Sequence, residues 1–522
     1  MSKAVKDQLF DLVKSLSKSE KRQFKLYVGR LGGNENAKFL SLFNLLDRMN
    51  EYREDEILQK EGIHKRQLTN IKAHLYRQIL VSLRLNPAHR NIRIQLREQL
   101  DFATILYHKG LYPQSLRVLD RAKALAMKHE EKNLAFEIIE LEKVIEAQYI
   151  TRSTRNRAEE LTTESAVLAE LNQLASELSN LALQLYGEFL KSGYAKDEQE
   201  YARLTEFFNS RLPDHDVLKM GFREKLWLYK AYLWYSFLVQ DFLSCYRYAL
   251  KWVQLFDEHP GMTNLNPVFF LRGHQYLLES LFFIQDRKRF PKALGRFREV
   301  VTGTDFPRDD NISSLIFLYS YTHQLNLHFL EGRFTDGLSL VDQVLEGIDR
   351  YRSTIDEHHV MTFYYKIACM YFGAGMYRES IDYLERIITN RALGMREDLL
   401  CYARILNLVA HYEAGLDYHL DSLIRQTYKF LIRMQDLYEV QREMMNFLRG
   451  LGDIYPHEIK REFVKLHAKL KTFEDHPYER RSFLYLDIIS WLESNIQGRP
   501  IEEVIQEKIR SEQQIGSPGF GK

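Results

Sequence analysis

Apolar residues follow a helical period on both sides of Gly375. On each side they recur at positions i, i+3, i+4 and i+7, so each set shares one face of a helix. Glycine adopts a left-handed turn at least cost, and the pattern therefore predicts a hairpin of two amphipathic helices over residues 361–389. The stripes are Tyr364, Ile367, Ala368 and Tyr371 before the glycine, and Ile381, Leu384, Ile387 and Ile388 after it.

Similar hairpins recur along the chain. Four expected turns, near Lys288, Gly332, Gly375 and Gly415, are roughly 40 to 44 residues apart. One hairpin cannot bury both of its faces, so such units must stack on their neighbours. The chain holds only 11 prolines and 25 glycines among 522 residues, which favours long helices over turn-rich β-structure. The sequence therefore predicts an all-α fold.

The hairpins resemble the tetratricopeptide repeat. In that family a small residue and an aromatic stand three positions apart in the first helix, a Gly-x-aromatic turn follows, and small and bulky residues continue in the second. The resemblance implies an α-solenoid, although the spacing exceeds the family period of about 34 residues and leucines fill the small position in three units. The matching residues are Ala368, Tyr371, Gly375, Tyr377, Ser380, Leu384 and Ile387, and, in an earlier unit, Ala103, Leu106, Gly110, Tyr112, Ser115, Leu119 and Ala122.

Breaks in the pattern divide the chain into four regions. We expect a basic helical module over residues 1–90, the tetratricopeptide-like solenoid over 91–435, capping helices over 436–510 and a disordered tail over 511–522. Ser17 and Glu20 have the spacing of a capping box, which predicts a helix N-terminus in the first region.

Charge sets the N-terminal module apart. Residues 1–100 hold 20 Lys and Arg against 11 Asp and Glu, a net charge of +9, whereas the remainder carries −7. A short helix, a turn at Gly62 and a long helix resemble a helix-turn-helix, with Leu58 in place of the usual small residue. Nucleic acid could contact the polar face of the long helix, although a solvated, idle face and an acidic protein partner are the alternatives. The candidates on that face are Arg66, Thr69, Asn70 and Arg77.

The resemblance also implies a concave groove that binds a peptide or protein segment and is lined by first-helix residues. The alternative is that these aromatics pack against the neighbouring hairpin and fill the groove. The candidates for partner binding are Tyr319, Asn326, Phe329, Thr362, Tyr365, Phe372, Tyr402 and Tyr412.

No motif indicates catalysis. The cysteines Cys245, Cys369 and Cys401 form no close pair and lie in apolar stretches, which predicts buried free thiols in a reducing compartment. We therefore expect a non-enzymatic protein with no cofactor and no metal. The chain lacks a secretory pattern at its N-terminus and a run of 18 apolar residues, so we expect a cytoplasmic protein without a membrane span. No feature indicates an oligomeric state.

Two functions follow from these patterns. The leading hypothesis is a cytoplasmic scaffold or adaptor that binds a protein or peptide along the groove. The alternative is a nucleic-acid-binding regulator that joins an N-terminal helix-turn-helix to a tetratricopeptide-like sensor, similar in architecture to peptide-sensing bacterial transcription regulators.

Overall fold

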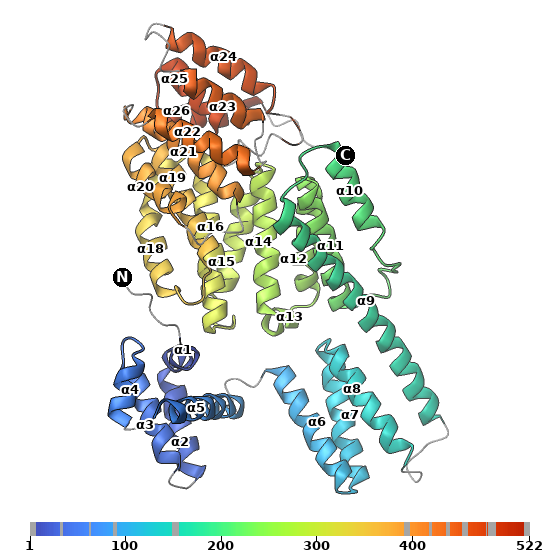
Figure 1. Cartoon of the computed structure of the whole chain (residues 1–522). Coiled ribbons are helices and arrows are strands. Elements are labelled where there is room, and N and C mark those ends of the chain that lie inside the picture. Colours follow the sequence, from blue (N-terminus) through green and yellow to red (C-terminus); the bar gives the residue numbers. More distant parts are fainter. Residues whose placement is uncertain are drawn as a thin grey trace. The chain divides into compact units, whose positions relative to one another are not determined.

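The fold is known from a computed structural model of the 522-residue chain. It describes residues 7–31, 35–61, 64–86, 91–148, 156–390, 397–416, 420–434, 439–450, 458–474, 476, 478 and 487–515. All regular secondary structure in these residues is helical, which confirms the predicted all-α class (Figure 1). The chain forms two compact units, Met1–Ala169 and Glu170–Lys522.

The first five helices of unit 1 share one hydrophobic core. Phe24, Phe43 and Leu75 are among its buried members. The predicted capping box is confirmed at the start of the second helix, where the Ser17 amide donates to Glu20 Oε2 at 2.6 Å and the Glu20 amide donates to Ser17 Oγ at 3.3 Å. These helices are α1 (Gln8–Ser15), α2 (Lys18–Leu31), α3 (Glu35–Arg48), α4 (Glu54–Glu61) and α5 (Lys65–Leu85).

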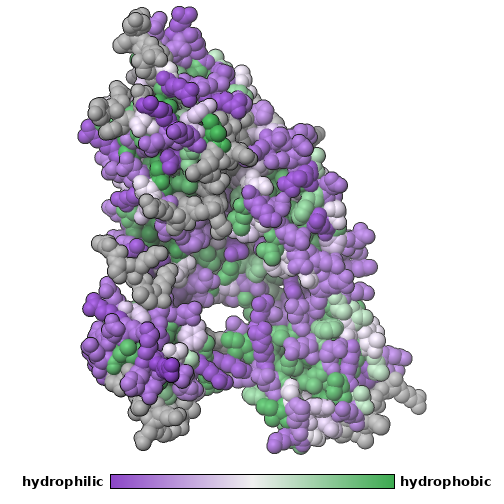
Figure 2. Space-filling model, viewed as in Figure 1, coloured by the Kyte–Doolittle hydropathy of each residue, from purple (hydrophilic) through white to green (hydrophobic). Residues whose placement is uncertain are grey.

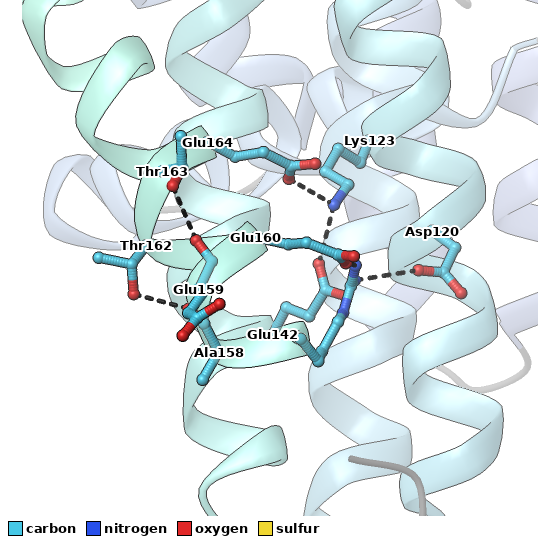
Figure 3. A network of polar contacts seen from close by, with 10 residues as sticks. Asp120, Lys123, Glu142, Ala158, Glu159, Glu160, Thr162, Thr163 and Glu164 are labelled. Atoms are coloured by element: carbon cyan, nitrogen blue, oxygen red, sulfur yellow. Dashed lines mark hydrogen bonds and ion pairs between the residues drawn. The ribbon is translucent and has the colours of Figure 1, made fainter. Parts of the chain in front are cut away.

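A second core in unit 1 lies among α6 (Ile92–His108), α7 (Tyr112–Lys128), α8 (Lys132–Glu146) and the beginning of α9 (Arg157–Ser192). A buried carboxylate, Glu142 of α8, joins three of these helices (Figure 3). It accepts from Lys123 of α7 at 3.3 Å and pairs with Arg157 of α9, while Lys123 also reaches Glu164 at 2.8 Å. Two cations around one buried carboxylate compensate its desolvation and fix the register of the helices.

Unit 2 continues the helical series from the rest of α9. Its core is rich in aromatic side chains, with Trp252, Phe297 and Phe372 fully buried. Its helices are α10 (Glu198–Asn209), α11 (Phe222–Leu238), α12 (Phe242–Glu258), α13 (Gly261–Leu265), α14 (Pro267–Phe283), α15 (Arg289–Thr302), α16 (Asp310–Glu331), α17 (Phe334–Gly337), the 3₁₀ helix Leu338–Leu340, α18 (Val341–Arg350), α19 (Glu357–Gly373), α20 (Tyr377–Ile388), α21 (Glu397–Glu413), α22 (Leu420–Met434), α23 (Glu439–Gly450), α24 (Ile459–Lys471), α25 (Ile488–Gln497) and α26 (Ile501–Ile515).

One turn geometry recurs between successive helices in both units. A residue with positive φ ends the first helix, its N–H bonds the carbonyl three residues back, and the next N–H bonds the carbonyl five residues back. This is the Schellman motif, which satisfies carbonyls left open at a helix end. The turn expected near Lys288 falls at Gln285. In the described residues the motif occurs at Gly110, Glu130, Gln240, Gln285, Gly332, Gly375 and Gly415.

A side-chain contact also recurs within the hairpins. Ser115 of α7 donates to the carbonyl of Ala103 in α6 at 2.7 Å, and Ser380 of α20 donates to the carbonyl of Ala368 in α19 at 2.9 Å. Each serine follows its turn glycine by five residues and is fully buried. Small residues at both positions let the two helices approach closely enough for this bond.

The C-terminal hairpin packs back on an earlier turn of unit 2. Glu502 of α26 accepts from the amide and hydroxyl of Thr335, at 3.3 and 2.6 Å, and Gln506 donates to the carbonyl of Gly332 at 3.0 Å. A Cβ on Gly332 would lie 2.6 Å from Ile505 Cγ2, so glycine permits this approach as well as the turn. The last helix is therefore fixed by contacts with residues far away in sequence.

The predicted boundaries at residues 90, 435 and 510 stay predictions. Helix α26 includes the first five residues of the predicted disordered tail, and residues 516–522 lie outside the described residues. In the described part of the chain, no helix combines the length and apolar character that crossing a membrane would require.

Candidate protein-binding surface

The first helices of five hairpins in unit 2 form a contiguous series, here called the first-helix row: α11, α14, α16, α19 and α21. Rings of α11 and α14 meet, and α14 packs on α16, α16 on α19, and α19 on α21. Figure 2 shows the surface of unit 2 hollowed over α14, with hydrophobic residues inside the hollow. The row is the part of the structure that corresponds to the predicted groove.

A chain of hydrogen bonds crosses three helices of this row. Lys366 Nζ of α19 donates to Asn326 Oδ1 of α16 at 2.6 Å, and Asn326 Nδ2 lies 3.4 Å from His323 Nδ1. His323 Nε2 lies 2.5 Å from Gln275 Oε1 of α14, whose amide donates to Glu279 Oε2 at 3.4 Å. With the proton of His323 on Nε2, every donor points from the lysine towards the glutamate. The chain links an ammonium group to a carboxylate through three neutral groups.

Burial shifts the pKa values of the ionisable groups in this chain of hydrogen bonds. Lys366 is 3% exposed, and burial lowers the pKa of its ammonium group from 10.5 to about 8. The rings of Phe282 and Phe329 lie 5.6 and 5.8 Å from its Nζ and favour the charged form. Burial, with the nearby Lys366, lowers the pKa of His323 to about 3, so the imidazole is neutral at pH 7. The neutral ring can therefore both donate and accept, as the chain requires.

The eight predicted partner-binding residues divide into two groups. Tyr319, Asn326, Tyr365 and Phe372 are buried in the core or in the hydrogen-bond chain. This burial favours the alternative that first-helix aromatics pack against neighbouring hairpins. The remaining four, which are half-buried and keep part of their surface accessible, are Phe329, Thr362, Tyr402 and Tyr412.

Helices near the C-terminus approach the end of the row. Tyr365 and Tyr402 line a small apolar pocket whose other walls include Met444 of α23 and Ile488 of α25. Glu413 of α21 accepts from the indole of Trp491 at 2.5 Å, which joins α25 to the same part of the row. Helices α23 and α25 therefore cover part of the row at α21.

The predicted nucleic-acid candidates lie together on α5. Arg66, Thr69, Asn70 and Arg77 are all exposed, and neither arginine forms an ion pair with a described residue. The Thr69 hydroxyl donates to the carbonyl of Lys65 at 3.3 Å. Figure 2 shows a mainly hydrophilic surface over α1–α5.

Nearby carboxylates offset part of the positive charge around α5. Lys65 pairs with Glu54 of α4 at 2.9 Å, and Lys72 pairs with Asp7. Helix α4 places Glu54, Asp55 and Glu56 in its first turn. The turn residues Gly62 and Ile63, on which the resemblance to a helix-turn-helix depends, lie outside the described residues.

The cysteines and histidines of the described residues form no further candidate site. Cys245, Cys369 and Cys401 are free and buried, as predicted, and burial raises the pKa of the Cys369 thiol to about 12. In the part of the chain that the structure describes, no three His, Cys, Asp or Glu side chains are grouped as a metal site.

Sequence reasoning missed the polar core of the row. Lys366 interrupts the apolar run from Phe363 to Phe372. A lysine within such a run is the one sequence feature that indicates a buried polar group here. His323 and Gln275 carry no signal of their own, because only the packing of α14 on α16 brings them together.

Comparison with known proteins found no relative of this chain. No family model, no curated protein and no solved structure matches it.

Proposed function

We propose that this protein is a non-enzymatic scaffold, an α-solenoid of tetratricopeptide-like hairpins that binds a protein or peptide along the first-helix row. The observation that carries the proposal is the repeated Schellman hairpin, whose first helices pack side by side from α11 to α21. Such a row offers many separate side chains along one extended surface, which suits a peptide better than a compact small molecule.

A capture experiment tests this function. Full-length protein is immobilised and exposed to extract from its own cells, with and without nuclease, and the retained proteins are identified. Tyr402→Ala changes a half-buried aromatic on the row, and Tyr246→Ala makes the same change on the second helix α12. We expect a nuclease-resistant protein that is retained by the wild type and by Tyr246→Ala and lost with Tyr402→Ala.

Circular dichroism must show both variants folded. If all three proteins retain the same set, the row is not the binding surface. If everything retained disappears after nuclease treatment, the adaptor function itself is wrong.

A second candidate function is nucleic-acid binding through α5. The specific observation in its favour is that Arg66, Asn70 and Arg77 are exposed together on one helix, the residue types that read guanine, adenine and phosphate. The acidic first turn of α4 is unfavourable to phosphate near the beginning of α5.

Charge reversal distinguishes specific contact from general attraction. Arg66→Glu with Arg77→Glu should abolish binding of duplex DNA or RNA, measured by fluorescence anisotropy at several salt concentrations. Arg22→Glu with Arg30→Glu alters net charge equally at exposed positions of α2 and should leave most of the affinity. If both double variants lose affinity for nucleic acid equally, the effect is one of net charge alone. If the variant with Arg66→Glu and Arg77→Glu still binds nucleic acid, contact through α5 is refuted.

A further inference from the structure

Two cations occupy equivalent positions in adjacent hairpins of the first-helix row. Lys230 of α11 lies between Trp227 and Trp234, and Arg272 of α14 is flanked at the same spacing by aromatics, 42 residues further along the chain. The flanking rings meet across the helices: Trp227 packs edge-on against Phe269 at 5.7 Å, and Trp234 packs edge-on against Tyr276 at 5.9 Å. The packing of the two repeats therefore brings the two cations side by side.

Neither cation has an acidic partner among the described residues. The Lys230 ammonium lies 4.6 Å from the centre of the Trp227 ring, and Arg272 lies near the Tyr319 side chain. Both of these partners are neutral. The carboxylate of Glu279, on the same helix as Arg272, accepts from the Gln275 amide at 3.4 Å. Within the described part of the chain, neither positive charge is therefore held in an ion pair.

The surroundings make this arrangement unfavourable without a ligand. Burial and the charge of Arg272 together lower the pKa of Lys230 from 10.5 to about 8. Like charges repel more strongly where aromatic side chains displace water. Arg272 is exposed and Lys230 is half-buried, so an anion from solvent can reach both.

We propose that Lys230 and Arg272 bind the phosphoryl group of a phosphorylated residue in a protein partner. A phosphate monoester carries about −1.5 to −2 charges at pH 7 and several acceptor oxygens, which matches two adjacent donors of charge +1. A single carboxylate would leave one cation uncompensated.

The same features disfavour a nucleic-acid chain here. Binding of a strand requires cations that follow successive phosphates and aromatic faces on which bases stack. The site described here offers two cations, Lys230 occupies the face of Trp227, and Trp234 and Tyr276 pack against each other. The site therefore fits one isolated anionic group.

This inference rests on the proposed function and adds the chemistry of the partner to it. The experiment uses immobilised degenerate peptide libraries with a central phosphoserine, phosphothreonine or phosphotyrosine, the same libraries after phosphatase treatment, and libraries with glutamate at the central position. Full-length wild-type protein should bind the phosphorylated libraries at least about tenfold better, because a charge-assisted hydrogen bond changes affinity by about that factor or more.

Variants assign the preference to the two cations. Lys230→Gln with Arg272→Gln should reduce binding of phosphorylated peptides to the level of the phosphatase-treated libraries, and Lys230→Arg should retain the preference. The matched control, Arg247→Gln with Lys251→Gln, removes the same charge from exposed positions on α12, where Lys251 lies 5.3 Å from the Tyr248 ring. It should behave as the wild type. Thermal melts check that each variant is folded.

Four results would overturn the inference: no preference for phosphopeptides in the wild type, a preference that persists in the Lys230 and Arg272 double variant, an equal loss in the control, or equal binding of the glutamate libraries. Peptide binding that ignores phosphorylation but is lost with Tyr402→Ala would leave the scaffold function standing and reject only this site. Inhibition by inorganic phosphate with no retained phosphopeptide would identify a site for the free ion and also reject the partner class.

Discussion

The buried ammonium group of Lys366 makes the stability of unit 2 depend on pH. Its pKa is lowered from 10.5 in the unfolded chain to about 8 in the folded protein. Between these values the unfolded chain holds one more proton than the folded protein, so the free energy of unfolding rises with pH. Below pH 8 both states are protonated, and the full unfavourable effect of burying the charge remains, about 3 kcal/mol for a shift of this size.

The test replaces this lysine by a side chain of similar length without charge. Lys366→Met removes the titrating group and leaves the Asn326 oxygen without its ammonium donor, a loss that offsets part of the relief at neutral pH. The clearer signal is therefore the pH dependence. From pH 7.5 to 9.5 the wild type should gain about 2 kcal/mol relative to Lys366→Met, or about 3 °C in melting temperature for a unit of this size.

Melting temperatures are compared at matched scan rates over this pH range. Lys292→Met, a change at an exposed lysine of α15, is the control and should follow the wild type at every pH. Buried tyrosines such as Tyr276, whose pKa burial raises, titrate in all three proteins and cancel in the comparison. Parallel curves for the wild type and Lys366→Met would show that Lys366 does not lose its proton in the folded protein, and the reasoning from burial would be wrong.

Three further predictions concern helix packing and helix propensity. A Cβ at Gly347 of α18 would overlap the ring of Phe317, so Gly347→Ala should destabilise the protein by about 1–3 kcal/mol. Gly295 lies in the middle of α15 with no atom close to the position of an added Cβ, so Gly295→Ala should stabilise the protein by up to about 1 kcal/mol. Ser380→Ala removes the hydrogen bond to the Ala368 carbonyl and should cost about 0.5–1.5 kcal/mol. Thermal or urea unfolding monitored by circular dichroism measures each change. Equal effects of the two glycine substitutions would contradict the packing of α18, and an unchanged melt for Ser380→Ala would show that this bond adds nothing to stability.

Local sequence determined the helices and most of the turns between them. Amphipathic stripes around Gly375 predicted α19 and α20, and the glycine has positive φ as expected. The capping box at Ser17 and Glu20 also formed, because both signals involve residues within one or two helical turns of each other. Gln285 and Gln240 take the same left-handed turn without glycine, and a rule based on glycine alone cannot find them.

Only the tertiary structure decided which polar groups are buried and which surfaces stay open. The spacing of Tyr365 and Phe372 placed both on a first helix, yet neighbouring helices bury them, because a helical period does not say what covers each face. The hydrogen bonds from Lys366 to Glu279 and the pair of Lys230 and Arg272 depend on contacts between residues 40 or more positions apart. Such contacts are set by the angle and offset at which whole helices pack, quantities that no local pattern in the sequence contains.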